Sequence, residues 1–202
     1  MFFSDQCFKY ETKEKDWTEI ANLNVARKNA ASLTLKDEFW ILGGESRMQI
    51  EKSTEILDKD ENGTLVWRMG PEMPYSLTGH CVVQLSKNKF FLIGGLFKDI
   101  VKFLKITLGG AVVNYYSGQQ WEQEHPSLQS RHLFLYDSKN ETNPWTERSP
   151  MTERRFGHSC GLITVDGDKK IVVAGGQTGD VMTKSNIRQI EIYDIEVHND
   201  VF

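Results

Sequence analysis

Three apolar runs in this chain each end in a pair of glycines, and this repeat constrains the fold more than any other feature. The runs are Phe39–Gly44, Phe90–Gly95 and Ile171–Gly176, and a tryptophan recurs with each of them at Trp17, Trp67 and Trp145. Gly43 and Gly94 are 51 residues apart, and the first two tryptophans are 50 residues apart. A period of about 50 residues with short strands and turns is typical of a β-propeller, in which each repeat folds as one small sheet.

The order of residues within each repeat predicts short strands. A methionine or leucine is followed by a polar turn and then by small residues, which suit an inner strand, over Leu23–Ser32, Met73–Cys81 and Met151–Ser159. The run that ends in two glycines is too short and too rich in β-branched and aromatic residues for a helix. A third strand alternates apolar and polar residues over Ser53–Asp58, His132–Asp137 and Gln189–Asp194. The tryptophan then closes the repeat on an outer strand, where its ring can cover the joint between sheets.

These features together resemble the kelch repeat family, and the resemblance covers nearly the whole chain apart from one insert. It implies an all-β, kelch-type β-propeller that is partial, with about three and a half four-stranded blades. Two positions depart from the family pattern, since Leu77 stands in place of an arginine and Leu57 in place of a tyrosine. We expect the polar contacts of those two turns to differ. The structural repeat residues are Gly43, Gly44, Gly94, Gly95, Gly175, Gly176, Trp17, Trp67, Trp145, His80 and His158.

The repeats divide residues 1–202, a single propeller portion, into four parts. Residues 1–20 are expected to form the second half of a blade, followed by repeats over 21–70, 71–148 and 149–202. The resemblance implies a ring of about six blades, so three and a half blades leave open edges. Stacked repeats need covered ends to stay soluble. We therefore expect either a fragment or a chain that self-associates through its open blade edges.

The second repeat is longer than the first by about 29 residues, which we assign to an insert over 101–129. Three interpretations remain open. The insert is a partner-binding loop, as long loops often are; or it is a translated intron, since Val101 and Gln129 fit codons at intron ends; or it is a membrane-active hairpin, which Lys102 and Lys105 disfavour.

Composition excludes several classes of partner. The net charge is −4, with 39% hydrophobic and 26% charged residues, so neither nucleic acid nor an anionic membrane surface is expected as a partner. No segment has the roughly 18 continuous apolar residues of a membrane helix, and the start lacks the features of a secretory signal. We therefore expect a cytoplasmic protein. Cys7, Cys81 and Cys160 show no CxxC spacing and are expected to be buried thiols in a reducing compartment.

No motif for catalysis is found, and no catalytic residue, cofactor or metal site is predicted. Nucleotide-binding glycine loops, the HExxH motif and the nucleophile elbow are all missing from the sequence. His80 and His158 occupy equivalent positions beside a turn, so we expect each ring to hydrogen-bond neighbouring backbone rather than a metal. Carboxylates such as Asp58 and Asp60 lie in predicted hairpin turns and are expected to be solvated. Some related propellers are copper-dependent galactose oxidases, but no Tyr/His set for copper is evident here.

The resemblance implies that partners dock on the turn before each first strand and on the loop after each glycine pair. The candidate partner-binding residues are Arg27, Lys28, Asn29, Ser46, Arg47, Phe97, Lys98, Arg154, Arg155, Phe156 and Gln177. Arginine with amides and aromatic rings suits an acidic or polar peptide segment. For Arg27 and Arg155, fixing their own turns is the stronger interpretation.

We therefore predict a non-enzymatic protein–protein interaction module that binds a ligase substrate or a cytoskeletal protein. It is similar to the substrate-recognition propeller of BTB–kelch-like ubiquitin-ligase adaptors. The alternatives are an actin-binding kelch scaffold and a galactose-oxidase-like propeller enzyme.

Overall fold

The computed structural model describes residues 3–97, 128–179 and 185–195, and every regular element within them is a β-strand. An antiparallel pair, here called the half-blade, comes first: β1(Cys7–Glu11) and β2(Asp16–Ile20). Blade 1 follows in the strand order β3(Ala31–Leu35), β4(Glu38–Leu42), β5(Thr54–Lys59), β6(Leu65–Met69). Blade 2 has the order β7(Cys81–Ser86), β8(Lys89–Ile93), β11(Leu133–Asp137), β12(Trp145–Arg148).

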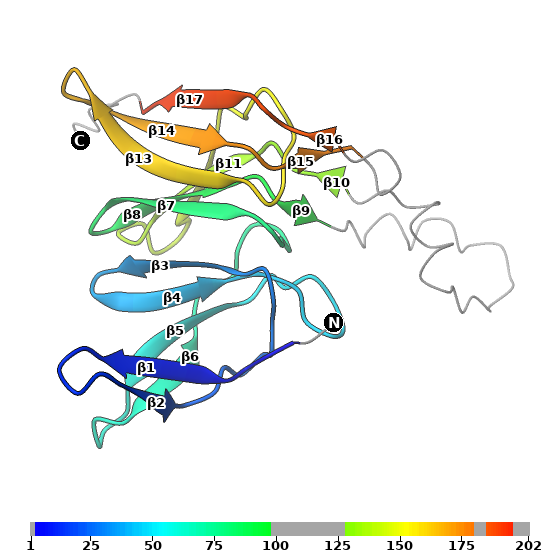
Figure 1. Ribbon diagram of the computed structural model, residues 1–202. Helices are drawn as coiled ribbons and strands as arrows, with labels where there is room; N and C mark the ends of the chain where they lie inside the picture. Colours follow the sequence, from blue (N-terminus) through cyan, green and yellow to red (C-terminus); the bar gives the residue numbers. More distant parts are fainter. Residues whose placement is uncertain (1–2, 98–127, 180–184, 196–202) are drawn as a thin grey trace, which may run out of the picture.

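Blade 3 contains three strands within the described residues: β13(Ser159–Val165), β14(Asp168–Ala174) and β17(Ile190–Asp194). Figure 1 shows the blades stacked in chain order, from the half-blade at the bottom to blade 3 at the top. The predicted all-β, partial propeller of repeated antiparallel sheets is confirmed. None of the described residues forms a helix long and apolar enough to cross a membrane.

Two short strand pairs extend the loops after the glycine pairs. β9(Leu96–Phe97) pairs with β10(Leu128–Gln129), and β15(Gln177–Thr178) pairs with β16(Ser185–Asn186). The sequence analysis assigns Leu128 and Gln129 to the insert, but they occupy the ladder positions that Ser185 and Asn186, respectively, take in blade 3. The additional residues therefore lie between Phe97 and Leu128. Residues 101–127 of the insert are outside the described residues.

The next blade approaches closely at Gly43 and Gly94, the first glycines of the pairs in blades 1 and 2. A Cβ on Gly43 would lie 2.5 Å from the Met73 methyl carbon, 2.5 Å from the Leu77 carbonyl oxygen and 2.9 Å from the His80 ring. On Gly94 it would lie 2.6 Å from the His158 ring and 3.1 Å from the Met151 methyl carbon. Both glycines also have positive φ, +58° and +62°. The pattern thus requires glycine both for backbone conformation and for space.

Two apolar cores fill the joints between blades. Side chains of alternate residues in blade 1, such as Trp40, Leu42 and Ile56, pack with Phe90 and Tyr136 of blade 2. The other face of blade 2 packs on blade 3 through Phe91, Ile93, Leu135, Ile171 and Val173. Each full blade is therefore buried on the face that meets its neighbour, and the stack derives its stability mainly from this apolar burial.

The tryptophans cover the outer part of these joints, as the sequence predicts. The indole nitrogen of Trp67 donates to the Ala21 carbonyl, and that of Trp145 donates to the Glu72 carbonyl, each at 2.9 Å. Both acceptors lie in the segment that leaves the preceding blade. The equivalent Trp17, in the half-blade, is 64% exposed.

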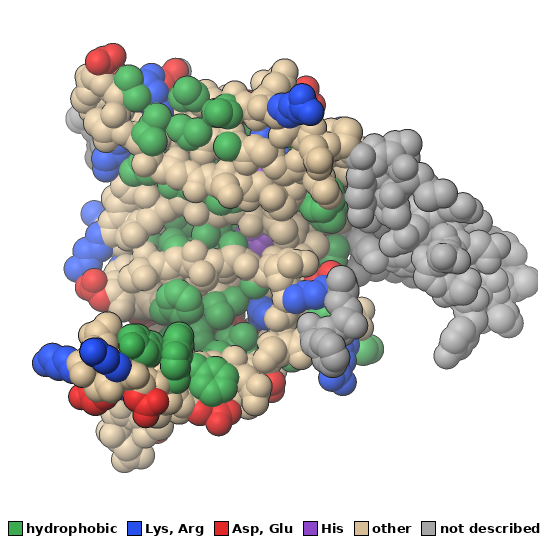
Figure 2. All heavy atoms as spheres, viewed as in Figure 1, with side chains coloured by type: hydrophobic (Ala, Val, Ile, Leu, Met, Phe, Trp, Pro, Cys, Tyr) green, Lys and Arg blue, Asp and Glu red, His purple; other side chains and the backbone are tan. Residues whose placement is uncertain are grey.

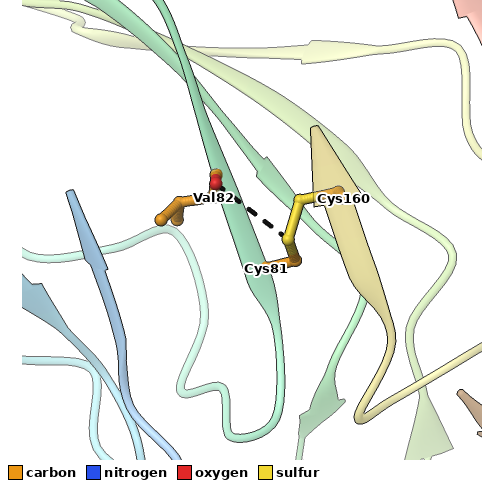
Figure 3. Close-up of a disulfide and its surroundings, with 3 residues drawn as sticks. All are labelled: Cys81, Val82 and Cys160. Atoms are coloured by element: carbon orange, nitrogen blue, oxygen red, sulfur yellow. Dashed lines mark hydrogen bonds between the residues drawn. A yellow bond between two sulfur atoms is a disulfide. The ribbon is translucent and has the colours of Figure 1, made fainter. Parts of the chain in front are cut away.

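The expectation of three reduced thiols is wrong for two of the cysteines. Cys81 in β7 and Cys160 in β13 form a disulfide that joins the inner strands of blades 2 and 3 (Figure 3). Their Cα atoms are 6.1 Å apart, although 79 positions separate them in sequence. Inner strands of neighbouring blades approach each other closely, which brings together residues of different repeats. Cys7 is a free, partly buried thiol.

Alanine substitutions at Gly43 and Gly175 separate the two requirements for glycine. Both residues have positive φ, +58° and +69°, but a Cβ on Gly175 meets no atom within 4 Å. We expect Gly175→Ala to lower the free energy of unfolding by about 1–2 kcal/mol through backbone strain alone. Gly43→Ala should lose about 1–3 kcal/mol more by overpacking. Urea denaturation measures both variants, and equal losses would contradict the role assigned to the close approach.

Candidate functional site

The structure brings the two predicted sets of partner-binding loops together at one end of the blades. Isolated backbone bridges join each turn to the loop after its own glycine pair: Lys28 to Glu45, Thr78 to Leu96 and Phe156 to Gln177. This loop end lies on the right in Figure 1, on the same side as β9, β10, β15 and β16. The hairpins that connect the first two strands of each blade lie at the opposite end.

Two of the candidates, Arg27 and Arg155, are buried inside their turns and are not exposed to a partner. The Arg27 guanidinium bonds Glu55 Oε1 at 2.6 Å and the Gly43 carbonyl oxygen at 2.7 Å. Arg155 repeats this arrangement with Glu191 Oε1 at 2.5 Å and the Gly175 carbonyl oxygen at 2.9 Å. We call this unit the arginine–glutamate pin. It ties the turn to the third strand and to the carbonyl of the first glycine.

The carboxylate of each pin also accepts backbone amides from the turn. Glu55 accepts the amides of Asn24 at 2.7 Å and Val25 at 3.1 Å. Glu191 accepts the amides of Thr152 and Glu153 at 2.6 and 3.2 Å. Burial raises the pKa of Glu191, but these amides and the Arg155 charge outweigh burial, so its pKa lies below the usual value for glutamate.

Blade 2 lacks the pin, and three of its residues differ together. Leu77 replaces the arginine, and Phe134, at the strand position of Glu55 and Glu191, replaces the carboxylate. Both side chains are buried in the core between blades 1 and 2. Pro74 stands where Asn24 and Thr152 donate an amide, so this position of blade 2 has no N–H that needs the missing carboxylate. The sequence analysis predicted a difference only at Leu77. An alignment of the three third strands would also have shown phenylalanine in blade 2 where the other two blades have glutamate.

An aromatic cluster, defined as Tyr75, Phe97, His132 and Phe134, occupies this part of blade 2. The Tyr75 ring lies 5.8 Å from His132, 5.6 Å from Phe134 and 6.1 Å from Phe97 between centroids. His132 Nδ1 is 2.6 Å from Glu147 Oε1, which fixes the imidazole. Tyr75 is 45% exposed, so the loop end presents one aromatic ring to solvent while that ring packs on the other three side chains of the cluster. Of the four residues only Phe97 was predicted.

The other candidates lie at the loop end in different environments. Lys28 pairs with Glu45 at 3.2 Å and lies over the Phe3 ring, and Gln177 lies 3.4 Å from Asn186. Ser46 accepts the amides of its own turn. Asn29, Arg47 and Arg154 are exposed, Phe156 is half-buried, and Lys98 is outside the described residues. Their role in binding stays a prediction.

His80 and His158 are buried, and each ring lies beside backbone, that of Leu42 for His80 and that of Ile93 for His158. The ring nitrogens form no hydrogen bond of good geometry. Burial, and next the proximity of His158, lower the pKa of His80 from 6.5 to about 3, which the backbone of Leu42 only partly opposes. Burial, and next the Arg155 charge, lower the pKa of His158 to about 4. The described residues contain no group of three His, Cys, Asp or Glu side chains that suits a metal ion.

Comparisons with known proteins support the repeat family inferred from the sequence. No protein-family model matches the chain. It is similar to Kelch-like protein 36 of Rattus norvegicus and Kelch-like protein 23 of Homo sapiens, each 24% identical over 94% of this chain. Kelch-like protein 25 of Rattus norvegicus is 23% identical over 95% of this chain. The resemblance to kelch repeats is confirmed.

The chain spans only part of these proteins: 25%, 26% and 35% of their respective lengths. Among solved structures it is similar to the one titled "Structure of YjhT", with a TM-score of 0.67 and 14% identity. That match covers 96% of this chain and 50% of the other. The likeness supports the fold, and it places this chain at about half of that structure.

Replacing the pin arginine tests the contribution of the arginine–glutamate pin to stability. Arg27→Leu leaves the buried Glu55 carboxylate without its cation, which is expected to cost about 3–5 kcal/mol of unfolding free energy. The double variant Arg27→Leu/Glu55→Phe imitates blade 2 and should recover part of that loss. Arg68→Ala, which removes partly exposed ion pairs with Glu38 and Asp58, is the control and should have a much smaller effect. Additive losses in the double variant would contradict the coupling of these positions.

The buried histidines predict that stability depends on pH. Their folded pKa values, about 3 and about 4, lie below the ordinary value of 6.5. Between pH 6.5 and 4 the unfolded chain therefore binds more protons than the folded chain, so stability is complete above pH 6.5 and falls as the pH drops. We expect the urea midpoint to decrease from pH 7 to pH 5, where most carboxylates remain ionised. In the double variant His80→Gln/His158→Gln the same interval should be nearly flat; an unchanged slope would assign it to other groups.

Proposed function

We propose that this chain is a non-catalytic, protein-binding portion of a kelch-type propeller whose main contact is the aromatic cluster of blade 2. The observation that carries this proposal is the exposed Tyr75 ring, packed against His132, Phe97 and Phe134 at the loop end. An exposed aromatic side chain that is held in place by packing on other rings is the type of residue that dominates binding energy in protein interfaces.

Two exposed arginines at the same end of the blades favour a peptide segment with acidic or polar groups. Arg47 and Arg154 are exposed at the loop end, and the guanidinium group bonds carboxylates in a fixed, planar geometry. An apolar or aromatic side chain of the partner would lie on Tyr75, while neighbouring carboxylates would meet the exposed arginines. The buried Arg27 and Arg155 take no part, because their donors bond within the pins.

The more specific proposal is that the chain recognises substrates for a BTB–kelch-like ubiquitin-ligase adaptor. The similarity to Kelch-like proteins 36, 23 and 25 supports it, although the chain covers 25–35% of those proteins. No contact among the described residues favours actin binding or a galactose-oxidase-like reaction in particular. Cosedimentation with actin and the copper content of the purified protein distinguish these two alternatives from the first.

We also propose a cytoplasmic location, and the disulfide is the observation that opposes it. Disulfides are rare in cytosolic proteins because the thiol pool keeps cysteines reduced. The bond between Cys81 and Cys160 would then form only under oxidation, or the protein resides in an oxidising compartment. Neither cysteine belongs to the aromatic cluster.

Tyr75→Ala should abolish capture of protein partners from cells, because it removes the exposed ring and leaves the buried part of the joint in place. Tyr75→Phe keeps the ring and should retain at least half of the capture. Lys87→Ala, at the opposite hairpin end with a 73% exposed side chain, is the control and should match the unchanged chain. Quantitative mass spectrometry after cross-linking measures the three variants; partners retained by Tyr75→Ala would place binding elsewhere.

Two further measurements separate the specific proposals. A chain that binds ligase substrates should raise the steady-state level of its partner when overexpressed, because it competes with the complete adaptor. Cosedimentation with filamentous actin would instead support the scaffold, and copper in the purified protein would support the oxidase.

A further inference from the structure

The hairpins between the third and fourth strands of blades 1 and 2 each contain an Asn-x-Thr triplet. Residues 62–64 (Asn-Gly-Thr) lie between β5 and β6, and residues 140–142 (Asn-Glu-Thr) lie between β11 and β12. The two hairpins are equivalent, because each comes directly before the strand that carries the tryptophan of its repeat, Trp67 or Trp145. Such a triplet, with any middle residue except proline, is the acceptor sequence for N-linked oligosaccharide on the surface of secreted proteins.

The first triplet is exposed in a turn that does not use the asparagine side chain. Residues 60–64 are all exposed, and the tip of this hairpin projects at the bottom of the molecule in Figure 2, below β1 and β2. Asp60 holds the turn, since its carboxylate accepts the backbone amides of Asn62 and Thr64 at 2.9 and 2.8 Å. No hydrogen bond among the described residues involves Nδ2 of Asn62, so the fold does not need that atom.

The second triplet is exposed as well, and its asparagine side chain bonds through oxygen alone. Residues 139–143 are all exposed. Asn140 Oδ1 accepts the Thr142 hydroxyl and the Asn143 backbone amide, each at 3.1 Å. Within the described part of the chain, Nδ2 of Asn140 donates no hydrogen bond. A substituent on Nδ2 would therefore replace a hydrogen atom that bonds no protein acceptor, and the hairpin would keep its own hydrogen bonds.

The disulfide between blades 2 and 3 is a second, independent observation. It joins Cys81 and Cys160 of the two inner strands (Figure 3). Disulfides form and persist in the lumen of the endoplasmic reticulum and outside the cell, which are also the places where N-linked oligosaccharide is added and retained. A cross-link inside the stack and acceptor triplets on its surface thus indicate the same type of compartment.

We propose that Asn62 and Asn140 are N-glycosylated and that the protein resides in an oxidising compartment. This assignment replaces the cytoplasmic location, and it takes the second of the two explanations given above for the disulfide. In the modification, Nδ2 of the asparagine displaces lipid diphosphate from the anomeric carbon of a lipid-linked oligosaccharide. One C–N bond forms, one C–O bond breaks, the diphosphate leaves with the bonding electrons, and the amide loses a proton.

The proposed oligosaccharides lie at the end of the blades opposite to the aromatic cluster. Successive strands of a blade are antiparallel, so the hairpin between strands three and four lies at the same end as the hairpin between strands one and two. The Ser138 amide donates to the Asn88 carbonyl at 3.0 Å, which places the hairpin of Asn140 beside the β7–β8 hairpin. Tyr75 lies at the loop end and stays accessible to a partner. Glycosylation and binding through Tyr75 are therefore independent proposals that fail separately.

Enzymatic removal of N-linked oligosaccharide tests the assignment. The full-length gene product, made in animal cells and separated on a denaturing gel, should gain mobility in two steps during limited digestion with peptide N-glycosidase F. The enzyme converts each modified asparagine to aspartate, so mass spectrometry should find aspartate at positions 62 and 140. A gel mobility that the enzyme does not change would overturn the proposal and would favour the cytoplasmic location.

Variants assign each step to one asparagine, and the denaturing gel makes the result independent of whether a variant folds. Asn62→Gln and Asn140→Gln should each lose one step, and the double variant should lose both. Thr64→Ser keeps the hydroxyl that the acceptor sequence requires and should keep both steps. Asn143→Gln, at an exposed hairpin asparagine outside any triplet, is the matched control and should also keep both. A step that persists in the double variant would contradict the assignment of these two sites.

Discussion

The rest of the structure depends on the close approach of one blade's turn to the first glycine of the preceding blade. At Gly43 and Gly94 the next blade places a methionine methyl group and a histidine ring where any Cβ would stand. That contact fixes the distance between successive sheets, and the apolar cores on either side of blade 2 fill the space that remains. It also buries His80 and His158, and this burial lowers the pKa of each ring so that both stay neutral at pH 7.

The turn that makes this approach is held in two chemically different ways. In blades 1 and 3 a buried arginine and glutamate tie it to the third strand, with the turn amides completing the carboxylate's hydrogen bonds. In blade 2 Leu77 and Phe134 replace the ion pair by apolar contact. Phe134 then supports Tyr75 and His132. The aromatic cluster therefore follows from the replacement of the pin, and it makes one repeat chemically distinct at the loop end.

The sequence predicts what depends on the repeat and misses what depends on neighbours in space. The glycine pairs, the tryptophans and the four-strand order recur at a fixed period, so the fold could be inferred from them. Cys81 and Cys160 are at positions of different repeats offset by one residue, and only the adjacency of β7 and β13 brings them together. Tyr75 had no repeated counterpart to mark it, and its exposure depends on Phe134, a residue 59 positions later.

The same reasoning relates the two surfaces that the structure leaves exposed. The aromatic cluster lies at the loop end, formed by turns between strands, whereas the apolar faces of β1, β2, β14 and β17 lie across the stack. A partner that binds through Tyr75 therefore covers the loop end and does not cover these apolar faces.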